Sequence, residues 1–583
     1  MPLGLMVLFL VYEVICESIN PVSTWWMGKI SSTTSFPSLT FWWKIGIYGF
    51  LGVAVFVLML LRALMTAKAT ARSARINHNQ LLDSVMNCPS SFFDTTPMGR
   101  ILNRFTGDIP QIDQFLFSRF LQVIGMWVGL IGQIVIVSVD TPWFLAIGLP
   151  ILVLYMGLLI LYARVSRNLQ RLESIARSPV LSHFNETISG AGLTTIRSFG
   201  REEAWKEKFH KVNDDLSVPF MLFREGQKWA SLYAAVISSL LFTGVMLIGW
   251  FFMDASKLSV AIMSSMTFSM MGLQLINMTV DLESKMTSFE RVDFYASKLP
   301  QEAKGHELEV PDSWPERGDV TFDRVKYKYR PGLPFVLKGV DFEIHGGEKI
   351  GVCGRTGAGK SSLLFALFRL VELDPKHAPK MIDMKTGFLV DSDPNEEPNS
   401  GRILIDGVDI SKLDIHRVRR SVAIIPQDPT LFTGTIRYNM DLAGHASDDR
   451  IWEVLEMIEM RDIVAGLPLG LDSQVAEGGG NFSAGQRQLL CFGRAILNNC
   501  RVVVMDEATA NVDVETDAKI QRTIREQFRE QTVIVIAHRL NTIMDSTRIM
   551  VMDQGYLSEF DTPENLKANP DSAFNSLIQS LNH

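Results

Sequence analysis

One glycine-rich stretch, from Gly354 to Ser361, restricts the fold more than any other part of the sequence. It reads GRTGAGKS and fits the pattern G-x-x-x-x-G-K-[S/T] of a phosphate-binding loop, or P-loop. The apolar run 349–353 before it predicts a strand, and the run 362–368 after it predicts a helix. The alternative is a chance glycine-rich turn, but this strand–loop–helix context is the one that a P-loop requires.

The residue types of this loop suit a nucleoside triphosphate. Glycines let the backbone bend so that successive N–H groups point at phosphate oxygens, and the helix N-terminus adds partial positive charge. Lys360 would reach the β- and γ-phosphates, and the Ser361 hydroxyl would bind Mg²⁺. The predicted nucleotide-binding residues of the loop are Gly354, Arg355, Thr356, Gly357, Ala358, Gly359, Lys360, Ser361 and Ser362.

The composition changes near residue 290. The chain has 583 residues, of which 47% are hydrophobic and 20% charged, and the long apolar runs lie before that point. The formal net charge of −7 argues against non-specific nucleic-acid binding, so we expect no nucleic-acid partner. The five cysteines are scattered without pairing or metal spacing, which indicates reduced thiols.

The apolar runs predict six membrane-spanning helices in a lipid bilayer, at about 3–27, 41–65, 115–139, 143–162, 229–253 and 258–280. No basic residue precedes Lys29, so the N-terminus does not read as a cleavable signal peptide. Lys and Arg gather in the two long connections after the second and fourth spans, which places these connections in the cytosol. The sequence thus predicts an integral, multi-pass membrane protein whose soluble half is cytosolic.

Within the membrane half, two stretches interrupt the helical pattern of the long connections, at 91–100 and 196–202. Each of them is either a docking turn or a plain loop. Ionisable and amide side chains also fall inside spans, where they are costly and often functional. They are Glu13, Glu17, Gln274, Asn277 and Asp281, and the pattern leaves open whether they line a cavity or bond neighbouring helices.

The soluble half contains an apolar run, 502–505, that ends in Asp506 and Glu507 and predicts a buried parallel strand. Asp506 would hold Mg²⁺, and Glu507 would polarise the attacking water as a catalytic residue. A helix N-cap is the alternative, which the upstream P-loop makes the weaker interpretation. A second apolar run, 532–537, ends at His538, which is either structural or a contact of the γ-phosphate.

These patterns divide the chain into a transmembrane domain at 1–295, a proline-containing linker at 296–316 and a nucleotide-binding domain at 317–583. A polar stretch at about 372–400 lies between two well-formed elements. It reads as a solvated insertion, with phosphorylation or partner binding as the alternative.

The ordered set of motifs resembles an ATP-binding cassette (ABC) transporter. It comprises the P-loop, the Gln427 loop at 424–428, the run 481–488, the Asp506–Glu507 strand, the run 510–513 and His538. The runs 91–104, 171–179 and 426–437 are similar to the multidrug-resistance-associated (C) subfamily, in its second, C-terminal half. Six spans and one cassette correspond to one half of an exporter.

This resemblance implies a type IV exporter-like α-helical membrane domain with six transmembrane helices, and an α/β P-loop ATPase domain with a helical subdomain. It implies ATP and Mg²⁺ as cofactors. Tyr329 would stack on adenine, and Gln427 would contact Mg²⁺ and act with Glu507 and His538 in catalysis. In a different cassette's site, Ser483, Gly485 and Gln486 would cap the γ-phosphate, and Asp513 would bridge the two sites. A second ABC half, in cis or in trans, is therefore the expected partner.

The sequence departs from the family pattern in three places. Phe482 and Ala484 stand where the family has Leu and Gly. Gln274 and Asn277 stand where the subfamily often has a Trp and an Arg implicated in anion binding. The first membrane half and first cassette have no counterpart here, so we expect either a fragment or a half-transporter.

The expected function is export driven by ATP hydrolysis, acting on small molecules such as organic anions, thiol conjugates or amphipathic drugs. The plasma membrane or an intracellular vesicle or vacuole membrane is the expected location. Two alternatives stay open: an ATP-gated channel or channel regulator of the same subfamily, and an inactive fragment that lacks its first half.

Overall fold

The computed structural model describes residues 3–31, 40–140, 142, 144–188, 190–302, 308–330, 332–373, 397–507, 514–537 and 540–581. The chain divides into two compact units. One comprises Met1–Val85 and Met98–Lys298 and is called the membrane unit below. The other comprises Met86–Pro97 and Leu299–His583 and is called the nucleotide unit.

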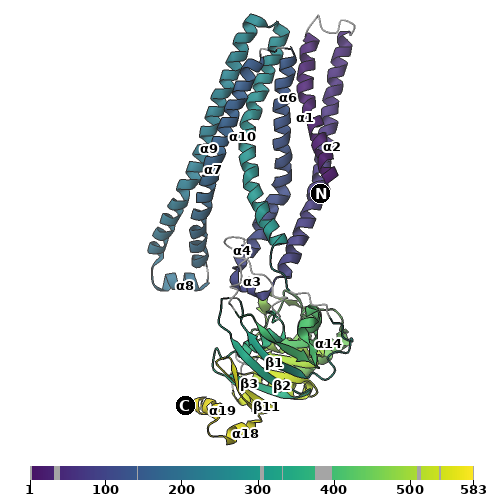
Figure 1. The fold of residues 1–583 in the computed structure, drawn as a ribbon, viewed down its shortest axis with the longest axis vertical. Helices are drawn as coiled ribbons and strands as arrows, with labels where there is room; N and C mark the ends of the chain where they lie inside the picture. Colours follow the sequence, from purple (N-terminus) through teal and green to yellow (C-terminus); the bar gives the residue numbers. More distant parts are fainter. Residues whose placement is uncertain are drawn as a thin grey trace. The chain divides into compact units, whose positions relative to one another are not determined.

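The membrane unit is a bundle of long helices (Figure 1). Two π-helical turns, Arg104–Asp108 and Ile112–Leu116, lie in the stretch before α6. The helices are α1 (Leu3–Ser31), α2 (Phe41–Met86), α4 (Met98–Asn103), α5 (Ile109–Gln111), α6 (Phe117–Asp140), α7 (Phe144–Ile188), α8 (Gly190–Ser198), α9 (Glu202–Phe252) and α10 (Ala255–Ser297).

Five helical stretches among the described residues are long and apolar enough to cross a membrane, judged by length and composition alone. The remaining predicted span forms helix α1 but is not among these five. The five stretches are Phe41–Met86, Met98–Val135, Leu145–Ile188, Glu202–Phe251 and Ala255–Ser297.

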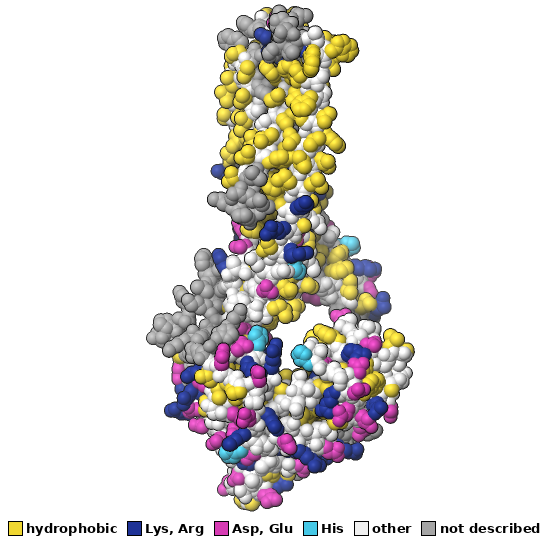
Figure 2. Space-filling model, turned by 90° about the vertical axis from the view of Figure 1, so that its right-hand side faces the viewer, with side chains coloured by type: hydrophobic (Ala, Val, Ile, Leu, Met, Phe, Trp, Pro, Cys, Tyr) yellow, Lys and Arg dark blue, Asp and Glu magenta, His cyan; other side chains and the backbone are white. Residues whose placement is uncertain are grey.

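The outer surface of these helices is apolar. Phe50 is 71% exposed and Trp250 82% exposed, while Leu130, Leu241 and Phe268 are buried between helices. Figure 2 shows hydrophobic side chains covering most of the face of this unit that it displays. An apolar surface this extensive is unfavourable in water and is covered in a bilayer, where lipid tails contact it.

A three-membered ion cluster joins α1 to α2. Arg62 Nη2 lies 2.5 Å from Glu13 Oε1, and Arg62 Nη1 lies 2.7 Å from Glu17 Oε1. Glu13 is fully buried, and a Cβ atom at Gly125 of α6 would lie 2.8 Å from its carboxylate, so only glycine leaves room there. Of the two interpretations left open for these glutamates, the structure shows bonding between helices.

The nucleotide unit contains a six-stranded sheet with the order β12-β11-β3-β10-β9-β6. Its strands are β3 (Lys349–Gly354), β6 (Val422–Ile425), β9 (Val502–Asp506), β10 (Thr532–Ile536), β11 (Arg548–Asp553) and β12 (Tyr556–Asp561). Neighbouring strands from β11 to β6 are parallel, and β12 pairs antiparallel with β11. The carboxyl ends of β3, β10, β9 and β6 therefore lie along one edge.

Two further sheets are antiparallel. One has the order β2-β1-β4-β5, with β1 (Val320–Tyr327), β2 (Leu337–Ile344), β4 (Ser400–Ile405) and β5 (Val408–Asp409). The other pairs β7 (Gly434–Thr435) with β8 (Gln474–Val475). The second pair accompanies α13 (Ile436–Met440), α14 (Asp448–Met457), α15 (Arg461–Ala465) and α16 (Ala484–Asn498), which form the helical subdomain.

Alternation along β9 explains why helices cover both faces of the six-stranded sheet. Val502 and Val504 belong to the core that contains α11 (Lys360–Leu367), whereas Val503 and Met505 belong to the core that contains α16. The other helices of this unit are α3 (Ser90–Thr95), α12 (Ile415–Ser421), α17 (Val514–Gln527), α18 (Pro563–Ala568) and α19 (Ala573–Leu581). This architecture confirms the predicted fold class.

The stretch predicted as a linker is bound along the nucleotide unit. Trp314 is buried and donates from Nε1 to the Ile405 carbonyl at 3.3 Å. The Asp406 carboxylate accepts four backbone N–H groups, those of residues 316–319, at 2.6 to 3.0 Å. Helix α10 itself continues to Ser297, so the predicted boundary at 296 falls inside its last turn.

The first predicted docking turn, 91–100, is divided between the units. Residues 91–97 lie in the nucleotide unit, where Phe92 of α3 is buried, and residues 98–100 begin α4 of the membrane unit. The second lies at the junction of α8 and α9 in the membrane unit, where Phe199 is 75% exposed.

We expect Arg62→Met to destabilise the membrane unit by about 3–5 kcal/mol, because it leaves the buried Glu13 carboxylate without its cation. The measurement is thermal unfolding of the purified chain in detergent. Lys206→Met is the matched control, since Lys206 pairs with Glu203 on an exposed surface and its loss changes stability little. Equal melting temperatures for the two variants would contradict the prediction.

Candidate functional site

The P-loop connects β3 to α11 through backbone conformations that favour glycine. Gly354, Gly357 and Gly359 have φ angles of 149°, 81° and 99°. A Cβ atom at Gly354 would overlap the Met552 carbonyl oxygen of the neighbouring strand β11. The loop therefore needs glycine at 354 for space as well as for conformation.

Lys360 sits at the start of α11 with its ammonium group turned into the loop. Its Nζ atom donates to the carbonyl oxygens of Gly354 at 2.9 Å and Arg355 at 3.2 Å. The residue is only 8% exposed. The loop thus holds a cation beside a helix N-terminus, an arrangement suited to phosphate.

The two carboxylates at the end of β9 face the loop and the Gln427 segment. Ser361 Oγ donates to Asp506 Oδ1 at 3.3 Å, and Gln427 Nε2 donates to Glu507 Oε2 at 3.0 Å. Glu507 adopts a left-handed conformation, with φ of 45°, and its N–H donates to the Ile536 carbonyl of β10. The structure therefore brings four sequence-predicted residues together in two contacting pairs at the sheet edge.

Burial raises the pKa of Asp506, and the neighbouring Glu507 carboxylate acts in the same direction. The Ser361 hydrogen bond and the Lys360 charge oppose this effect. A divalent cation at Asp506 would favour its ionised form for the same electrostatic reason.

The donor atoms in this place suit Mg²⁺. Ser361, Gln427 and Asp506 offer a hydroxyl, an amide and a carboxylate oxygen, which are the hard ligands that Mg²⁺ takes. Among the residues that the structure describes, no group of three or more His, Cys, Asp or Glu side chains could hold a metal ion. Mg²⁺ commonly completes its coordination with substrate phosphates and water, and these donors fit that mode.

Tyr329 lies beside the first turn of α11. Its hydroxyl is 2.8 Å from Ser362 Oγ, and its ring lies 5.7 Å from that of Phe365 in an edge-on arrangement. The structure thus places Tyr329 next to the P-loop helix, while its stacking on adenine stays a prediction.

The run 481–488 forms the start of α16. Ser483 is the N-cap: its Oγ accepts the Gln486 N–H at 3.2 Å, and Gln486 Oε1 accepts the Ser483 N–H at 2.9 Å. Gly485 is buried in the first turn. Phe482, one of the departures from the family pattern, is buried in the core of the helical subdomain, so the larger ring fills apolar space.

Two predicted site residues, Asp513 and His538, lie outside the described residues, as do positions 508–512 of the same loop. Most of the predicted insertion, residues 374–396, is also outside them. Their predicted roles stay predictions.

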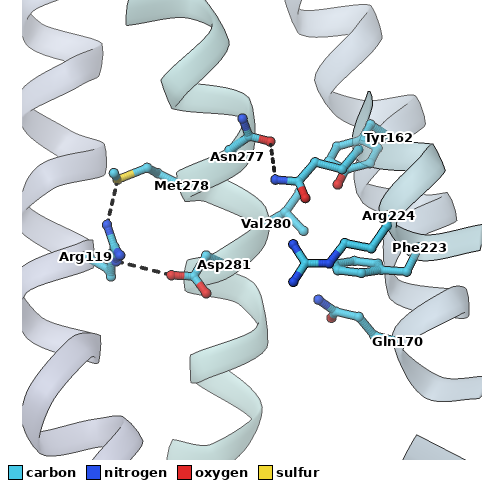
Figure 3. Close-up of a pocket in the computed structure, with 10 residues that line it drawn as sticks. Arg119, Tyr162, Gln170, Phe223, Arg224, Asn277, Met278, Val280 and Asp281 are labelled. Atoms are coloured by element: carbon cyan, nitrogen blue, oxygen red, sulfur yellow. Dashed lines mark hydrogen bonds and ion pairs between the residues drawn. The ribbon is translucent and has the colours of Figure 1, made fainter. Parts of the chain in front are cut away.

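The membrane unit contains a cavity of about 370 Å³ between α6, α7, α9 and α10 (Figure 3). Arg119 Nε lies 3.2 Å from Asp281 Oδ2, and Gln227 Nε2 donates to Asn277 Oδ1 at 3.4 Å. The lining residues are Arg119, Tyr162, Gln170, Phe223, Arg224, Gln227, Asn277, Met278, Val280 and Asp281.

Sequence reasoning singled out Asn277 and Asp281 but not the two arginines opposite them. The sequence does carry one signal for Arg224. It lies three residues before Gln227 on α9, and residues three apart share a helix face, so the two polar side chains could have been expected on one face. Gln274, which was grouped with Asn277, is exposed and does not line this cavity.

Two family models match the chain. Residues 6–276 match the ABC transporter transmembrane region, and residues 393–510 match the ABC transporter model. The chain belongs to the ABC transporter family. The first match covers most of the membrane unit, and the second covers strands β6 and β9 of the parallel sheet with the Gln427, Ser483 and Glu507 segments.

Curated proteins similar to the chain include members of subfamily C. The chain is 37% identical over 550 residues to ATP-binding cassette sub-family C member 2 of Rattus norvegicus, covering 93% of the chain and 34% of that protein. It is 40% identical over 530 residues to sub-family C member 3 of Mus musculus, covering 90% and 33%. It is 38% identical over 549 residues to multidrug resistance protein mrp-7 of Caenorhabditis elegans, covering 92% and 34%. The chain spans about a third of the length of these relatives.

We expect Lys360→Ala to weaken ATP binding by about 1.5–3 kcal/mol, or roughly 10- to 150-fold, because it removes the cation of the loop. Equilibrium titration of the purified chain with a fluorescent ATP analogue measures the effect. The exposed Lys567→Met on α18 is the control and should bind as the unmodified chain does. Unchanged affinity in Lys360→Ala would rule out this loop as the phosphate site.

Proposed function

We propose that the chain is one half of an ABC exporter, corresponding to the second half of a subfamily C transporter, which hydrolyses ATP together with a second ABC half. The observation that carries the proposal is the paired contacts Ser361–Asp506 and Gln427–Glu507 at the carboxyl edge of the parallel sheet. Ligands of open α/β sheets bind at this edge. Family membership supports the same activity.

In this proposal the P-loop binds the triphosphate of ATP through its N–H groups and through Lys360. Ser361, Gln427 and Asp506 would hold Mg²⁺, which supplies positive charge to the β- and γ-phosphates when bound. Glu507 orients the attacking water and accepts its proton, and the Gln427 amide holds the Glu507 carboxylate in place. Tyr329 and His538 are assigned to the adenine and the γ-phosphate.

The same proposal requires a partner cassette. Among the described residues, Ser483 and Gln486 bond to each other rather than to the P-loop, which supports their assignment to the nucleotide of another cassette. The exposed Phe199 beside α8 offers an apolar contact for that second half. The partner is bound in cis or in trans, and Asp513 is assigned to the bridge between the two sites.

The cavity of Figure 3 supports an amphipathic substrate that carries one negative charge. Arg119 is neutralised by Asp281, whereas Arg224 has no carboxylate partner among the described residues. Phe223 and Tyr162 add aromatic surface to the same wall. Organic anions, thiol conjugates and amphipathic drugs with an acidic group fit this combination. We assign export to the plasma membrane or to a vesicle or vacuole membrane, with the cassette on the cytosolic side.

A vesicle-uptake experiment tests the export function. Inside-out vesicles are supplied with a labelled thiol conjugate or a neutral drug, with and without ATP. Uphill uptake that depends on ATP supports export, whereas ionic current without uphill uptake would favour a channel. A monomeric chain without ATPase activity or uptake would support the inactive fragment.

Glu507→Gln should leave ATP binding within about twofold of the unmodified chain, since the amide keeps the size of the side chain and only the base is lost. Turnover should fall by about 100-fold or more, in the range expected for general-base catalysis. Phosphate release and nucleotide titration measure the two quantities. Undiminished turnover would exclude Glu507 as the base.

Arg224→Gln should raise the KM for an anionic conjugate by roughly tenfold, the effect of losing one charged hydrogen bond. The KM for a neutral drug should stay unchanged, because no charge pairing is lost. Uptake kinetics in vesicles provide both values. Equal changes for the charged and neutral substrates would argue against an anion contact at Arg224.

A further inference from the structure

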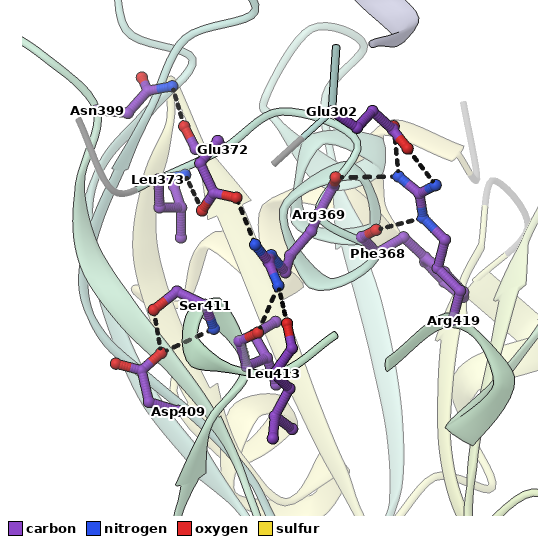
Figure 4. Close-up of polar contacts among 11 residues, drawn as sticks. Glu302, Phe368, Arg369, Glu372, Leu373, Asn399, Asp409, Ser411, Leu413 and Arg419 are labelled. Atoms are coloured by element: carbon purple, nitrogen blue, oxygen red, sulfur yellow. Dashed lines mark hydrogen bonds and ion pairs between the residues drawn. The ribbon is translucent and has the colours of Figure 1, made fainter. Parts of the chain in front are cut away.

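A polar cluster in the nucleotide unit lies at the C-terminal end of the P-loop helix α11 (Figure 4). The Glu302 carboxylate accepts two hydrogen bonds from Arg419 of α12, at 2.7 and 2.8 Å. The same guanidinium donates to the carbonyl oxygens of Phe368 and Arg369, each at 3.2 Å. Arg419 therefore binds both a carboxylate outside the sheet core and the first two carbonyl groups after the end of α11.

The end of α11 is held rigidly. Arg369 adopts a left-handed conformation, with φ of 47°, which terminates the helix where glycine is more common. Its buried guanidinium donates to the carbonyl groups of Ile410 and Leu413, both at 2.8 Å, and to the Glu372 carboxylate at 2.6 Å. These bonds offset the cost of the conformation and fix the position of the carbonyl groups that Arg419 contacts.

The chain segments that follow α2 and α10 meet at this cluster. Glu302 lies five residues after the end of α10, and its N–H donates to the carbonyl group of Asn87, the first residue after α2, at 2.8 Å. Ser90, which begins α3, donates from its hydroxyl to the Leu370 carbonyl at 2.8 Å. Within the nucleotide unit, the segments that follow α2 and α10 are thus bonded to each other and to the residues just after the P-loop helix.

We propose that Glu302 and Arg419 form a joint that transmits movement of the P-loop helix to the segments that follow α2 and α10. The inference rests on the proposed ATP-driven function and names positioning residues for it. Helix α11 carries Lys360 and Ser361 at one end and the joint at the other, a length of roughly 12 Å for its eight residues. Because a short helix moves as a rigid rod, displacement at the phosphate end displaces the joint.

The thiol of Cys88 supplies a local reporter of the joint. Cys88 is 4% exposed, and burial together with the Glu302 carboxylate raises its pKa to about 12. A buried, protonated thiol reacts slowly with maleimide, so its labelling rate measures how often this place opens. The other four cysteines are buried elsewhere and are distinguished by mass spectrometry of the labelled peptides.

The test compares Arg419→Met and Glu302→Gln with the unmodified chain in lipid nanodiscs. We expect both variants to bind ATP normally and to label Cys88 several-fold faster, because the ion pair no longer holds the segment. In a Glu507→Gln background, ATP with Mg²⁺ should change the Cys88 labelling rate, and adding Arg419→Met should abolish that change. Arg402→Met is the matched control, since Arg402 pairs with Asp323 on an exposed surface of the same unit.

Vesicle uptake gives a second readout. The ratio of transport to ATP hydrolysis should fall by about tenfold in Arg419→Met, within the range of typical coupling energies. Arg419→Lys should recover part of this ratio, because it keeps the charge but loses the two-pronged contact. If Arg419→Met fails to fold, Glu302→Gln and Arg419→Lys carry the test.

Two results would contradict the proposed joint. One is that ATP changes the Cys88 labelling rate equally in the chain that keeps Arg419 and in the Arg419→Met variant. The other is a loss of transport and hydrolysis in the same proportion, which indicates a structural role only. If the unmodified chain shows no ATP-driven uptake in the presence of a second ABC half, the proposed function fails, while the Cys88 measurement still decides whether bound ATP reaches the joint.

Discussion

The hydrogen-bonded ladder of parallel strands in the nucleotide unit is the constraint on which the rest of the site depends. It aligns the carboxyl ends of β3, β9 and β6, so that residues up to about 150 positions apart in the chain meet at one edge. The ladder needs apolar residues on both faces, and the alternate side chains of β9 supply them to two separate cores. Because helices cover both faces of the sheet, a ligand can reach it at the edge formed by the carboxyl ends of the strands.

The membrane unit follows a different constraint, since its exterior is apolar and its polar groups are gathered inside. Charges that occur within the helices are paired, as Arg62 is with Glu13 and Glu17, and Arg119 with Asp281. Arg224 differs because no carboxylate among the described residues pairs with it, and this difference supports the proposed contact with an anionic substrate.

The cluster at Glu302 and Arg419 lies within the nucleotide unit. A carboxylate from the stretch after α10 binds a guanidinium that also caps the P-loop helix. Helix C-termini favour cations near their free carbonyl groups, so Arg419 is stabilised by both contacts at once. These contacts hold the Glu302 segment against the end of the P-loop helix, as the proposed joint requires.

The sequence by itself determined the fold class, the P-loop and the identity of the carboxylates, because each depends on local patterns. Apolar runs define spans and buried strands, and the glycine spacing defines a loop that only such residues can form. Family membership followed from the same ordered motifs. The roles of Asp513 and His538 stay predictions, since both lie outside the described residues.

Only the tertiary structure decided which side chains meet across elements. The Gln427–Glu507 contact, the Arg62 ion cluster and the Arg224 side of the cavity join residues from different helices or strands. The predicted linker likewise proved to be bound, because Asp406 and Arg417 satisfy its backbone groups. Sequence periodicity reports the face on which a residue lies but not the partner opposite it, since partners are chosen by packing over long sequence distances.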